Sequence, residues 1–550
     1  MHLNATAKVI VLITWFLFLM QISHAQTLTK ETGNNTAACS GVGDPLGLQS
    51  YCAGYFAGFA TTSSNTNAQT KVADSIPGHM SPLPLKTYLY HDATTKFIAP
   101  YQAWFCTTGP AGPYNGTQTC TVSNAGSHKI VGYNENSSSV VATQHTHMIN
   151  LGYWAVSPDW YGTNTAKQGF INQTVIAEVQ DLSTRNNKTY PLKLLIMLDG
   201  GAVLAGTNTL AGCPQDHNDE TTCITQNIEA DLDYIDSNWA ENPYYARDSS
   251  GANLVTFFLT ECSWPSVGCS GNSGLTNWAT IMNDVYVHIA SYKTPMKLIK
   301  EYGNFTEYGF SGAYAWPQPL VYVNGNNNGY TYPAIPSVTG DCTTSAPGCM
   351  QFYWNQPGAN NYQYLDDFYS LATTTYKGDI ALGELFKGFD WSNASWGNPQ
   401  KIIAQQCGQI LTDSAAKINA AYSSTMQLEF AQTPTWNDYE EGAEVETGVD
   451  NCYQVQNAAY SQSQDQLTWQ LNPVSGQQNY VSLSTVHGYT VWVASSTGAL
   501  RSIASLPATA TSLNNVSSLV GTHGAGTKLY VEMVGMPLII NRMSNGVPFP

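Results

Sequence analysis

Seven short apolar runs alternate with helix-like segments between residues 96 and 438, and this alternation constrains the fold more than any other feature. The runs that we interpret as strands are Lys96–Phe105, Gly152–Gly162, Leu192–Gly201, Asn253–Glu261, Ser311–Pro317, Asp379–Asp390 and Met426–Asp438. Strands separated by helices form parallel βαβ units. Seven or eight such repeats over about 350 residues predict an α/β fold with a closed (β/α)8 TIM barrel. A doubly wound open sheet is the alternative, but no GxGxxG motif follows the first run.

Polar and aromatic side chains stand at the ends of nearly all these runs. They include Gln102, Trp104, Asp159, Trp160, Asp199, Glu261, Asp390, Trp391 and Asp438. A barrel of this type gathers its active site at the carboxyl ends of its strands. The sequence therefore predicts that acids and aromatic rings from several strands converge on one rim.

The regions outside the barrel follow other patterns. Residues 1–25 have the charge, apolar run and small-residue ending of a secretory signal peptide, with an uncleaved anchor as the alternative. Residues 26–95 show no periodicity and are expected to form an irregular extension. After a barrel over residues 96–452, residues 453–550 contain short alternating runs split by Gly, Asn, Ser and Pro. That pattern is typical of an antiparallel, immunoglobulin-like β-sandwich.

The twelve cysteines indicate an oxidising compartment. Most are near neighbours in sequence: Cys39/Cys52, Cys106/Cys120, Cys213/Cys223, Cys262/Cys269 and Cys342/Cys349. Cys407 and Cys452 remain and could pair with each other. None forms a CxxC motif, so disulfides are the better interpretation. We therefore expect a secreted, periplasmic or cell-surface protein, free of the membrane once the signal is cleaved.

The charge balance restricts the partners. Charged residues make up only 11% of the chain, and the formal net charge is −17. Such a chain repels phosphate backbones, which argues against a nucleic-acid partner. Its polar surface must consist mostly of neutral side chains, which suits a hydroxyl-rich ligand. We expect a monomer with a polysaccharide or oligosaccharide as its partner.

The segment TWNDYEEGAEVE, residues 435–446, concentrates carboxylates in this weakly charged chain. Asp438 and Glu441 stand three residues apart after the last predicted strand, and Gly442 allows a sharp turn. Hydrolysis of a glycosidic bond needs one carboxyl group as acid and a second as base or nucleophile. Two acids this close influence each other's pKa, which separates their roles. The alternative is a solvated acidic loop, and we expect Glu440, Glu444 and Glu446 to be solvated.

Two further stretches carry candidate binding residues. In SPDWYG, Asp159 could contact sugar hydroxyls or support the catalytic pair, although it could also cap a turn. In FKGFDW, Lys387 and Asp390 could bind hydroxyls while Trp391 stacks on a sugar ring. Core packing is the alternative for each aromatic residue.

His145 and His147 form an H-x-H pair that would suit a metal on a strand. Here the pair lies in a helical pattern, which points the two rings apart. The sequence also lacks HExxH, GxSxG and P-loop motifs. We expect neither a metal site nor a cofactor, and a metal-dependent hydrolase is the weaker alternative.

The stretches TWNDYEEG, DWYG, FKGFDWSNASWG and IIAQQCGQ together resemble glycoside hydrolase family 71, the endo-1,3-α-glucanases or mutanases. HKIVGYNEN and the W-N-[DE]-x-x-E-G form are also similar to family 99, the endo-α-mannosidases and mannanases. The resemblance covers roughly residues 96–452. The chain departs from family 71 at Glu440, where that family has glycine, and in the EEGAEVE continuation, which looks more like family 99.

The resemblance implies endo-hydrolysis of α-glycosidic bonds by a barrel that is commonly followed by a β-sandwich. The acids of the family 71 motif match Asp438, Glu441 and Asp159. We interpret Glu441 as the general acid, Asp438 as the general base and Asp159 as their support. The residues expected to line the glycan cleft are Tyr101, Gln102, Trp104, Tyr161, Glu261, Lys387, Asp390, Trp391 and Trp436. The first candidate substrate is α-1,3-glucan. An α-mannan and a non-catalytic carbohydrate-binding protein on a barrel scaffold are the alternatives.

Overall fold

The structure is a computed structural model of the 550-residue chain. It describes residues 80–81, 83–105, 134–162, 165–186, 191–200, 203, 220–258, 278–301, 305–317, 321–323, 330–331, 359–360, 362–390, 402–403, 406–438, 441–446, 448–474, 481–495 and 500–550. The predicted signal peptide and most of the predicted extension lie outside these ranges. So do Glu261, Trp391 and at least one cysteine of each near-neighbour pair.

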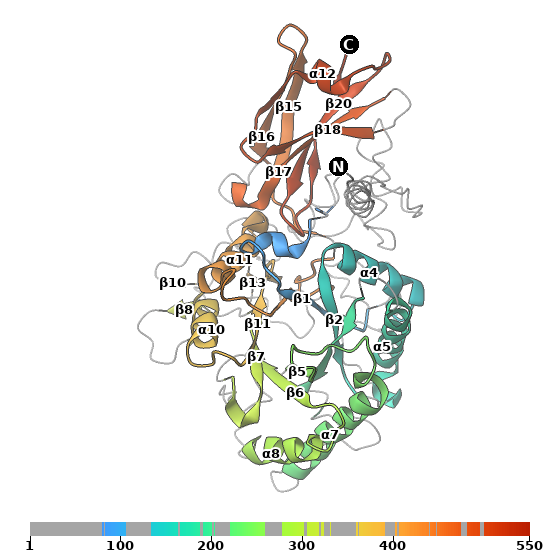
Figure 1. Ribbon diagram of the computed structural model, residues 1–550, viewed down its shortest axis with the longest axis vertical. Helices are drawn as coiled ribbons and strands as arrows, with labels where there is room; N and C mark the ends of the chain where they lie inside the picture. The colour runs from blue at the N-terminus through green and yellow to red at the C-terminus, as the bar shows by residue number, and fades with distance from the viewer. Residues whose placement is uncertain are drawn as a thin grey trace, which may run out of the picture.

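Eight parallel strands of the described chain close into a barrel (Figure 1). They are β1 (Lys96–Tyr101), β2 (Tyr153–Trp160), β4 (Ile196–Asp199), β5 (Asn253–Phe258), β6 (Met296–Glu301), β7 (Gly312–Tyr314), β11 (Ile380–Glu384) and β14 (Phe430–Gln432). The last strand pairs with the first, so that Ile98 lies opposite Gln432. The predicted closed barrel is confirmed. Strand β6 was not among the seven predicted runs, and the short β3 (Lys193–Leu194) pairs with β2 beside β4.

Helices surround this barrel (Figure 1). They are α4 (Ser138–Asn150), α5 (Thr165–Arg185), α7 (Glu220–Ile235), α8 (Trp278–Ile289), α10 (Gln363–Thr373) and α11 (Gln409–Ala421). In α10 the buried side chains Tyr364, Leu365, Phe368, Tyr369 and Ala372 recur at helical spacing. They therefore form one apolar face, which packs on the barrel wall.

Shorter elements connect these layers. They are the helical turns η1 (Leu85–Tyr88), η2 (Asp236–Ala240), η3 (Glu307–Gly309) and η5 (Gln406–Gly408), and the strands β8 (Val321–Val323), β9 (Tyr330–Thr331), β10 (Ala359–Asn360), β12 (Phe389–Asp390) and β13 (Ile402–Ile403). Strands β8–β10 form one small antiparallel sheet and β12–β13 another.

Alternation along the strands separates two apolar clusters. The cluster inside the barrel includes Ile98, Ala155, Met197, Leu254, Ile299, Tyr314, Leu382 and Phe430. A larger cluster between barrel and helices takes the other side of β1, with Phe97, Ala99 and Tyr101. Successive side chains of a strand point to opposite faces. Gln102, which follows β1 in the same alternation as Ile98, is therefore expected on the inner side.

The C-terminal part of the chain forms antiparallel sheets. One contains β15 (Tyr453–Ser461), β16 (Gln466–Pro473) and β19 (Ser512–Asn514). The other contains β17 (Val486–Ala494), β18 (Leu500–Pro507), β20 (Lys528–Gly535), β21 (Arg542–Met543) and β22 (Val547–Pro548). The turn η6 (Leu483–Thr485) and helix α12 (Val516–Val520) complete this part. One apolar cluster includes residues of both sheets, with the rings of Trp469 and Tyr489 5.3 Å apart. The immunoglobulin-like arrangement stays a prediction.

The contacts that tie the C-terminal sheets to the barrel include a disulfide, an ion pair and a backbone bridge. Cys407 and Cys452, the two cysteines outside the near-neighbour pairs, form the disulfide that the sequence suggested. Asp450 pairs with the buried Arg542, with Oδ1 2.5 Å from Nη2. A parallel bridge joins residues 449 and 539. In the described part of the chain no helix has both the length and the apolar character to cross a membrane.

Candidate active site

Four carboxyl groups gather where the barrel strands end. Asp159 is near the end of β2, Asp199 ends β4, and Asp438 and Glu441 follow β14. The pKa of Asp159 is raised well above its usual range, first by burial and then by the charges of Asp199, Asp438 and Glu441. Such effects require the four groups to be close together. The structure therefore brings together the three predicted catalytic residues and adds Asp199 to them.

The carboxylate of Asp438 is held from two sides. Its Oδ2 accepts a hydrogen bond from Nε2 of Gln102 over 3.2 Å, and its Oδ1 accepts one from the backbone N–H of Glu441 over 3.0 Å. Its own N–H donates to Oγ1 of Thr435 over 2.9 Å. Gly442 takes a positive φ of 59°, which is the sharp turn expected after the two acids. Asp438 is thus fixed in orientation, with only 4% of its surface exposed.

Glu441 differs from Asp438 in its surroundings. Glu441 is half-buried, whereas Asp438 and Asp159 are buried. An arrangement with one fixed, hydrogen-bonded carboxylate and a second, more accessible carboxyl group suits paired acid and base roles. Asp159, whose raised pKa favours the protonated form, adds a third group that can hold a proton beside them.

Lys387 and Glu444 form a buried ion pair near this rim. Lys387 follows β11, and its Nζ lies 2.9 Å from Oε1 of Glu444, with both side chains almost completely buried. Glu446 is also buried and accepts a hydrogen bond from Nε2 of Gln144 over 3.1 Å. The expectation that Glu444 and Glu446 are solvated is therefore wrong. Each is paired with a side chain from a distant part of the sequence, which a local pattern cannot reveal.

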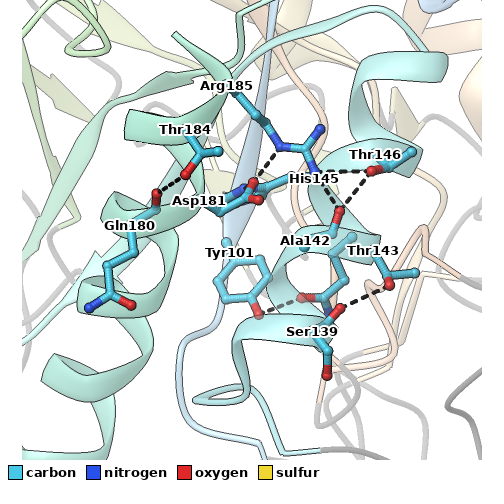
Figure 2. A network of polar contacts seen from close by, with 11 residues as sticks. Tyr101, Ser139, Ala142, Thr143, His145, Thr146, Gln180, Asp181, Thr184 and Arg185 are labelled. Carbon is cyan, nitrogen blue, oxygen red and sulfur yellow. Dashed lines mark hydrogen bonds and ion pairs between the residues drawn. The ribbon is translucent and has the colours of Figure 1, made fainter. Parts of the chain in front are cut away.

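Tyr101 and Trp436 belong to the packing between barrel and helices. The hydroxyl of Tyr101 points towards α4 and donates to Oε1 of Gln144 over 2.8 Å (Figure 2). The ring of Trp436 is completely buried and meets the ring of Tyr153 edge-on, with centroids 5.8 Å apart. We therefore leave both residues out of the proposed glycan-binding set.

Trp104 and Tyr161 come together from the segments that follow β1 and β2. Their rings meet edge-on with centroids 5.8 Å apart, and both are mostly buried. Together with Gln102 they stand at the carboxyl ends of adjacent strands. Asp390 ends the short strand β12. Glu261 and Trp391, as stated above, lie outside the described residues.

Glu384 was not singled out from the sequence, although it ends β11. Its side chain is fully buried and accepts a hydrogen bond from the hydroxyl of Tyr364 over 3.0 Å. Burial raises its pKa well above the usual range, the Tyr364 bond opposes this, and Glu301 at the end of β6 adds to it. The signal that could have found it is its position, since an acid closes the apolar run ALGE.

The two histidines of the H-x-H pair lie on α4, and both are buried. Nδ1 of His145 lies 2.8 Å from Oδ2 of Asp181, and Arg185 donates to the same oxygen (Figure 2). Burial lowers the pKa of His145, although Asp181 opposes the shift. Among the described residues no group of three or more His, Cys, Asp or Glu side chains is arranged to hold a metal ion.

No protein-family model and no curated protein matches the chain. Among solved structures, a GH99 endo-alpha-mannosidase from Bacteroides thetaiotaomicron is similar over 64% of this chain and 87% of its own, with 12% identity and a TM-score of 0.36. The same description with bis-tris-propane bound gives the same coverage and identity with a TM-score of 0.38. A glycoside hydrolase-like protein covers 66% of this chain and 92% of its own, with 12% identity and a TM-score of 0.39. Similarity this low carries no argument about what this chain does.

Proposed function

We propose that the protein is a secreted, endo-acting glycoside hydrolase that cleaves α-glycosidic bonds, with α-1,3-glucan as its first candidate substrate. The observation that carries the proposal is the meeting of Asp159, Asp438 and Glu441 at the carboxyl ends of barrel strands. A glycosidic bond is hydrolysed between two carboxyl groups, one protonating the leaving oxygen and one activating the attacking group.

The two catalytic roles follow from the surroundings of each acid. Glu441, the more accessible group, protonates the leaving oxygen. Asp438, held as an acceptor by Gln102 and by the Glu441 backbone, acts as the base that activates the attacking group. Asp159 supports them from the buried side of the site. Gln102, Trp104 and Tyr161 complete the proposed glycan site, together with Glu261, Asp390 and Trp391. Lys387 is left out of this set, because its ammonium group is buried and paired with Glu444.

The choice of an α-linked glucan rests on the resemblance of the TWNDYEEG, DWYG and FKGFDWSNASWG stretches to family 71. An α-mannan is the second candidate, because the continuation after Glu441 is more similar to family 99. The low charge of the chain suits a neutral glycan in either case. We propose a monomer that acts outside the cytoplasm.

The test is release of oligosaccharides from a panel of soluble and insoluble α-glucans and α-mannans, with wild type beside Glu441→Gln. Loss of the general acid typically lowers turnover by ~10²–10⁴-fold. Glu429→Gln is the matched control. Glu429 directly precedes β14 and pairs with Lys96 at the start of β1, so this pair lies at the end of the barrel away from the site. We expect it to keep wild-type turnover.

The outcomes separate the parts of the proposal. Products from α-1,3-glucan that disappear in Glu441→Gln would support both substrate and acid. Products from mannan alone would overturn the choice of α-1,3-glucan as substrate and leave the assignment of the catalytic residues unchanged. Equal rates in wild type and Glu441→Gln would show that another group is the acid. Tight glycan binding without any hydrolysis would favour a carbohydrate-binding protein.

A further inference from the structure

Asn437 directly precedes Asp438 and is completely buried. Its Oδ1 accepts a hydrogen bond from the backbone N–H of Gln102 over 2.8 Å, and its Nδ2 donates to the carbonyl oxygen of Gln102 over 3.0 Å. Both polar groups of the Gln102 backbone are therefore held by one side chain. Two neighbouring residues therefore hold Gln102, because Asn437 binds its backbone and Asp438 binds its side chain.

Glu135 holds Asn437 from behind. One carboxylate oxygen of Glu135 accepts from Nδ2 of Asn437, and the other accepts from the N–H of Phe105 over 2.8 Å. The backbone N–H of Glu135 in turn donates to the carbonyl of Phe105 over 3.1 Å. Glu135 is fully buried and so links Asn437 to the segment that follows β1.

These partners fix the orientation of the Asn437 amide. Its nitrogen faces two oxygens, those of Gln102 and Glu135, and its oxygen faces an N–H group. Turning the amide over would place oxygen against two acceptors and nitrogen against a donor. Only one orientation satisfies the buried groups, so the set is rigid.

We propose that Asn437 and Glu135 are positioning residues that act on Asp438 through Gln102. Gln102 donates from Nε2 to Oδ2 of Asp438, so the direction of its side chain sets the direction of the carboxylate. The other amide atom of Gln102, Oε1, is buried and accepts no hydrogen bond from the described residues. The inference rests on the proposed function.

Asn437→Asp tests the relay with almost no change of volume. The substitution places an oxygen where Nδ2 faces the Gln102 carbonyl and Glu135. We expect kcat to fall by about 10²-fold with a much smaller change in KM, because misplacement of a reacting group by about 1 Å has this effect. We also expect the limb of the pH profile that reports Asp438 to move.

Asn419→Asp is the matched control. Asn419 on α11 makes the same paired contact with another backbone segment, accepting from the N–H of Tyr90 and donating to the carbonyl of Tyr88, both over 2.9 Å. This pair lies before β1, at the opposite end of the barrel from Asp438. We expect Asn419→Asp to keep wild-type kcat and pH profile.

The double variant Asn437→Asp with Glu135→Gln provides a rescue. The new amide at position 135 can donate to the new carboxylate at position 437 and still accept from Phe105. Burial raises the pKa of Glu135, so the comparison is made at a pH where Glu135 is ionised. There the double variant has the same net charge as wild type, and added charge does not explain its behaviour. We expect it to recover about 10-fold in kcat over Asn437→Asp. Wild-type kcat and pH profile in Asn437→Asp, or a rescue of melting temperature without rescue of kcat, would overturn the positioning role.

A crystal structure of Asn437→Asp tests the relay without any activity. We expect the contact between Nε2 of Gln102 and Oδ2 of Asp438 to be lost, and its retention would overturn the inference. If wild type hydrolyses no glycan, the proposed function fails, and this geometric result still decides whether Asn437 orients Asp438.

Discussion

Nε2 of Gln102 lies 3.2 Å from Oδ2 of Asp438, although 336 residues separate them in the sequence. The contact exists because β14 returns to pair with β1, with Ile98 opposite Gln432 and the N–H of Trp436 bonded to the carbonyl of Pro100. The orientation of the proposed base is therefore a consequence of barrel closure.

Gln102→Glu should disturb Asp438 through charge while keeping the side-chain length. The donor at Nε2 becomes an oxygen, and a like charge beside a carboxylate disfavours its ionised form. We expect the acidic limb of kcat/KM to move to higher pH and kcat to fall about 10-fold or more. Gln427→Glu, at the opposite end of the barrel before β14, is the control. An unchanged pH profile in Gln102→Glu would contradict this account of the contact.

Asp159→Asn should stabilise the protein at neutral pH. Burial and then the neighbouring acids raise the pKa of Asp159 when the chain folds. The folded state therefore binds more protons than the unfolded state, and stability falls as pH rises above 3.8, the ordinary pKa of an aspartate side chain. Removing the titrating group abolishes this loss. We expect a gain of about 1–2 kcal/mol at pH 7 that disappears at acid pH, at the cost of activity.

Asp248→Asn is the control of opposite sign for this measurement. Burial tends to raise the pKa of Asp248, but the hydrogen bonds from Lys297, Ser250 and Ala252 lower it overall. Its contribution is present above the unfolded pKa and lost in acid. Thermal unfolding between pH 3 and pH 8 should therefore show Asp248→Asn losing stability at neutral pH where Asp159→Asn gains it. Equal losses in both would contradict the assignment of Asp159.

The sequence was sufficient for the barrel and for the acids at its rim, because both depend on the local order of strand, turn and helix. Strand β6 was not predicted because its run MKLIKE contains three charged residues. In the structure its buried Lys300 is paired with Glu307, 2.6 Å away. A partner supplied after the strand makes a charged residue compatible with a buried wall, and composition alone cannot show that.

The faces of the site residues could not be predicted in the same way. Tyr101 and Gln102 are adjacent, yet Tyr101 bonds to α4 and Gln102 bonds to Asp438. Which of two neighbours points inward depends on the strand register, and one residue of slip reverses every side chain. Asn437 was overlooked for a related reason. Its role depends on contacts with residues more than 300 positions away.

Lys387→Met should destabilise the fold strongly. It would leave the buried carboxylate of Glu444 without the ammonium group 2.9 Å away, and breaking one side of a buried pair typically costs 3–5 kcal/mol. Replacing both partners, as in Lys387→Met with Glu444→Leu, should recover most of that loss because no charge is stranded. Urea unfolding of wild type, both single variants and the double variant gives the coupling energy. Additive effects would contradict a direct pair.

Glu532 should make the C-terminal sheets less stable as pH rises towards neutrality. Burial raises its pKa from 4.5 to about 7, although the hydrogen bonds from Asn541 and Trp492 act in the opposite direction. The folded state therefore keeps a proton that the unfolded state releases between these two values, and stability falls with rising pH across that window. A shift of this size corresponds to about 3 kcal/mol.

Glu532→Gln tests this by removing the titration while keeping the shape of the side chain. The amide cannot accept from both Nδ2 of Asn541, 2.9 Å away, and Nε1 of Trp492, 2.7 Å away, so the variant loses one hydrogen bond at every pH. Its free energy of unfolding should therefore start below that of wild type at pH 5 and approach or cross it by pH 8. Asp465→Asn in the same part of the chain, where the carboxylate is exposed and bonded to Ser517, should not flatten the curve in this window. Parallel curves for wild type and Glu532→Gln would show that Glu532 is ionised throughout this pH range and would contradict the raised pKa.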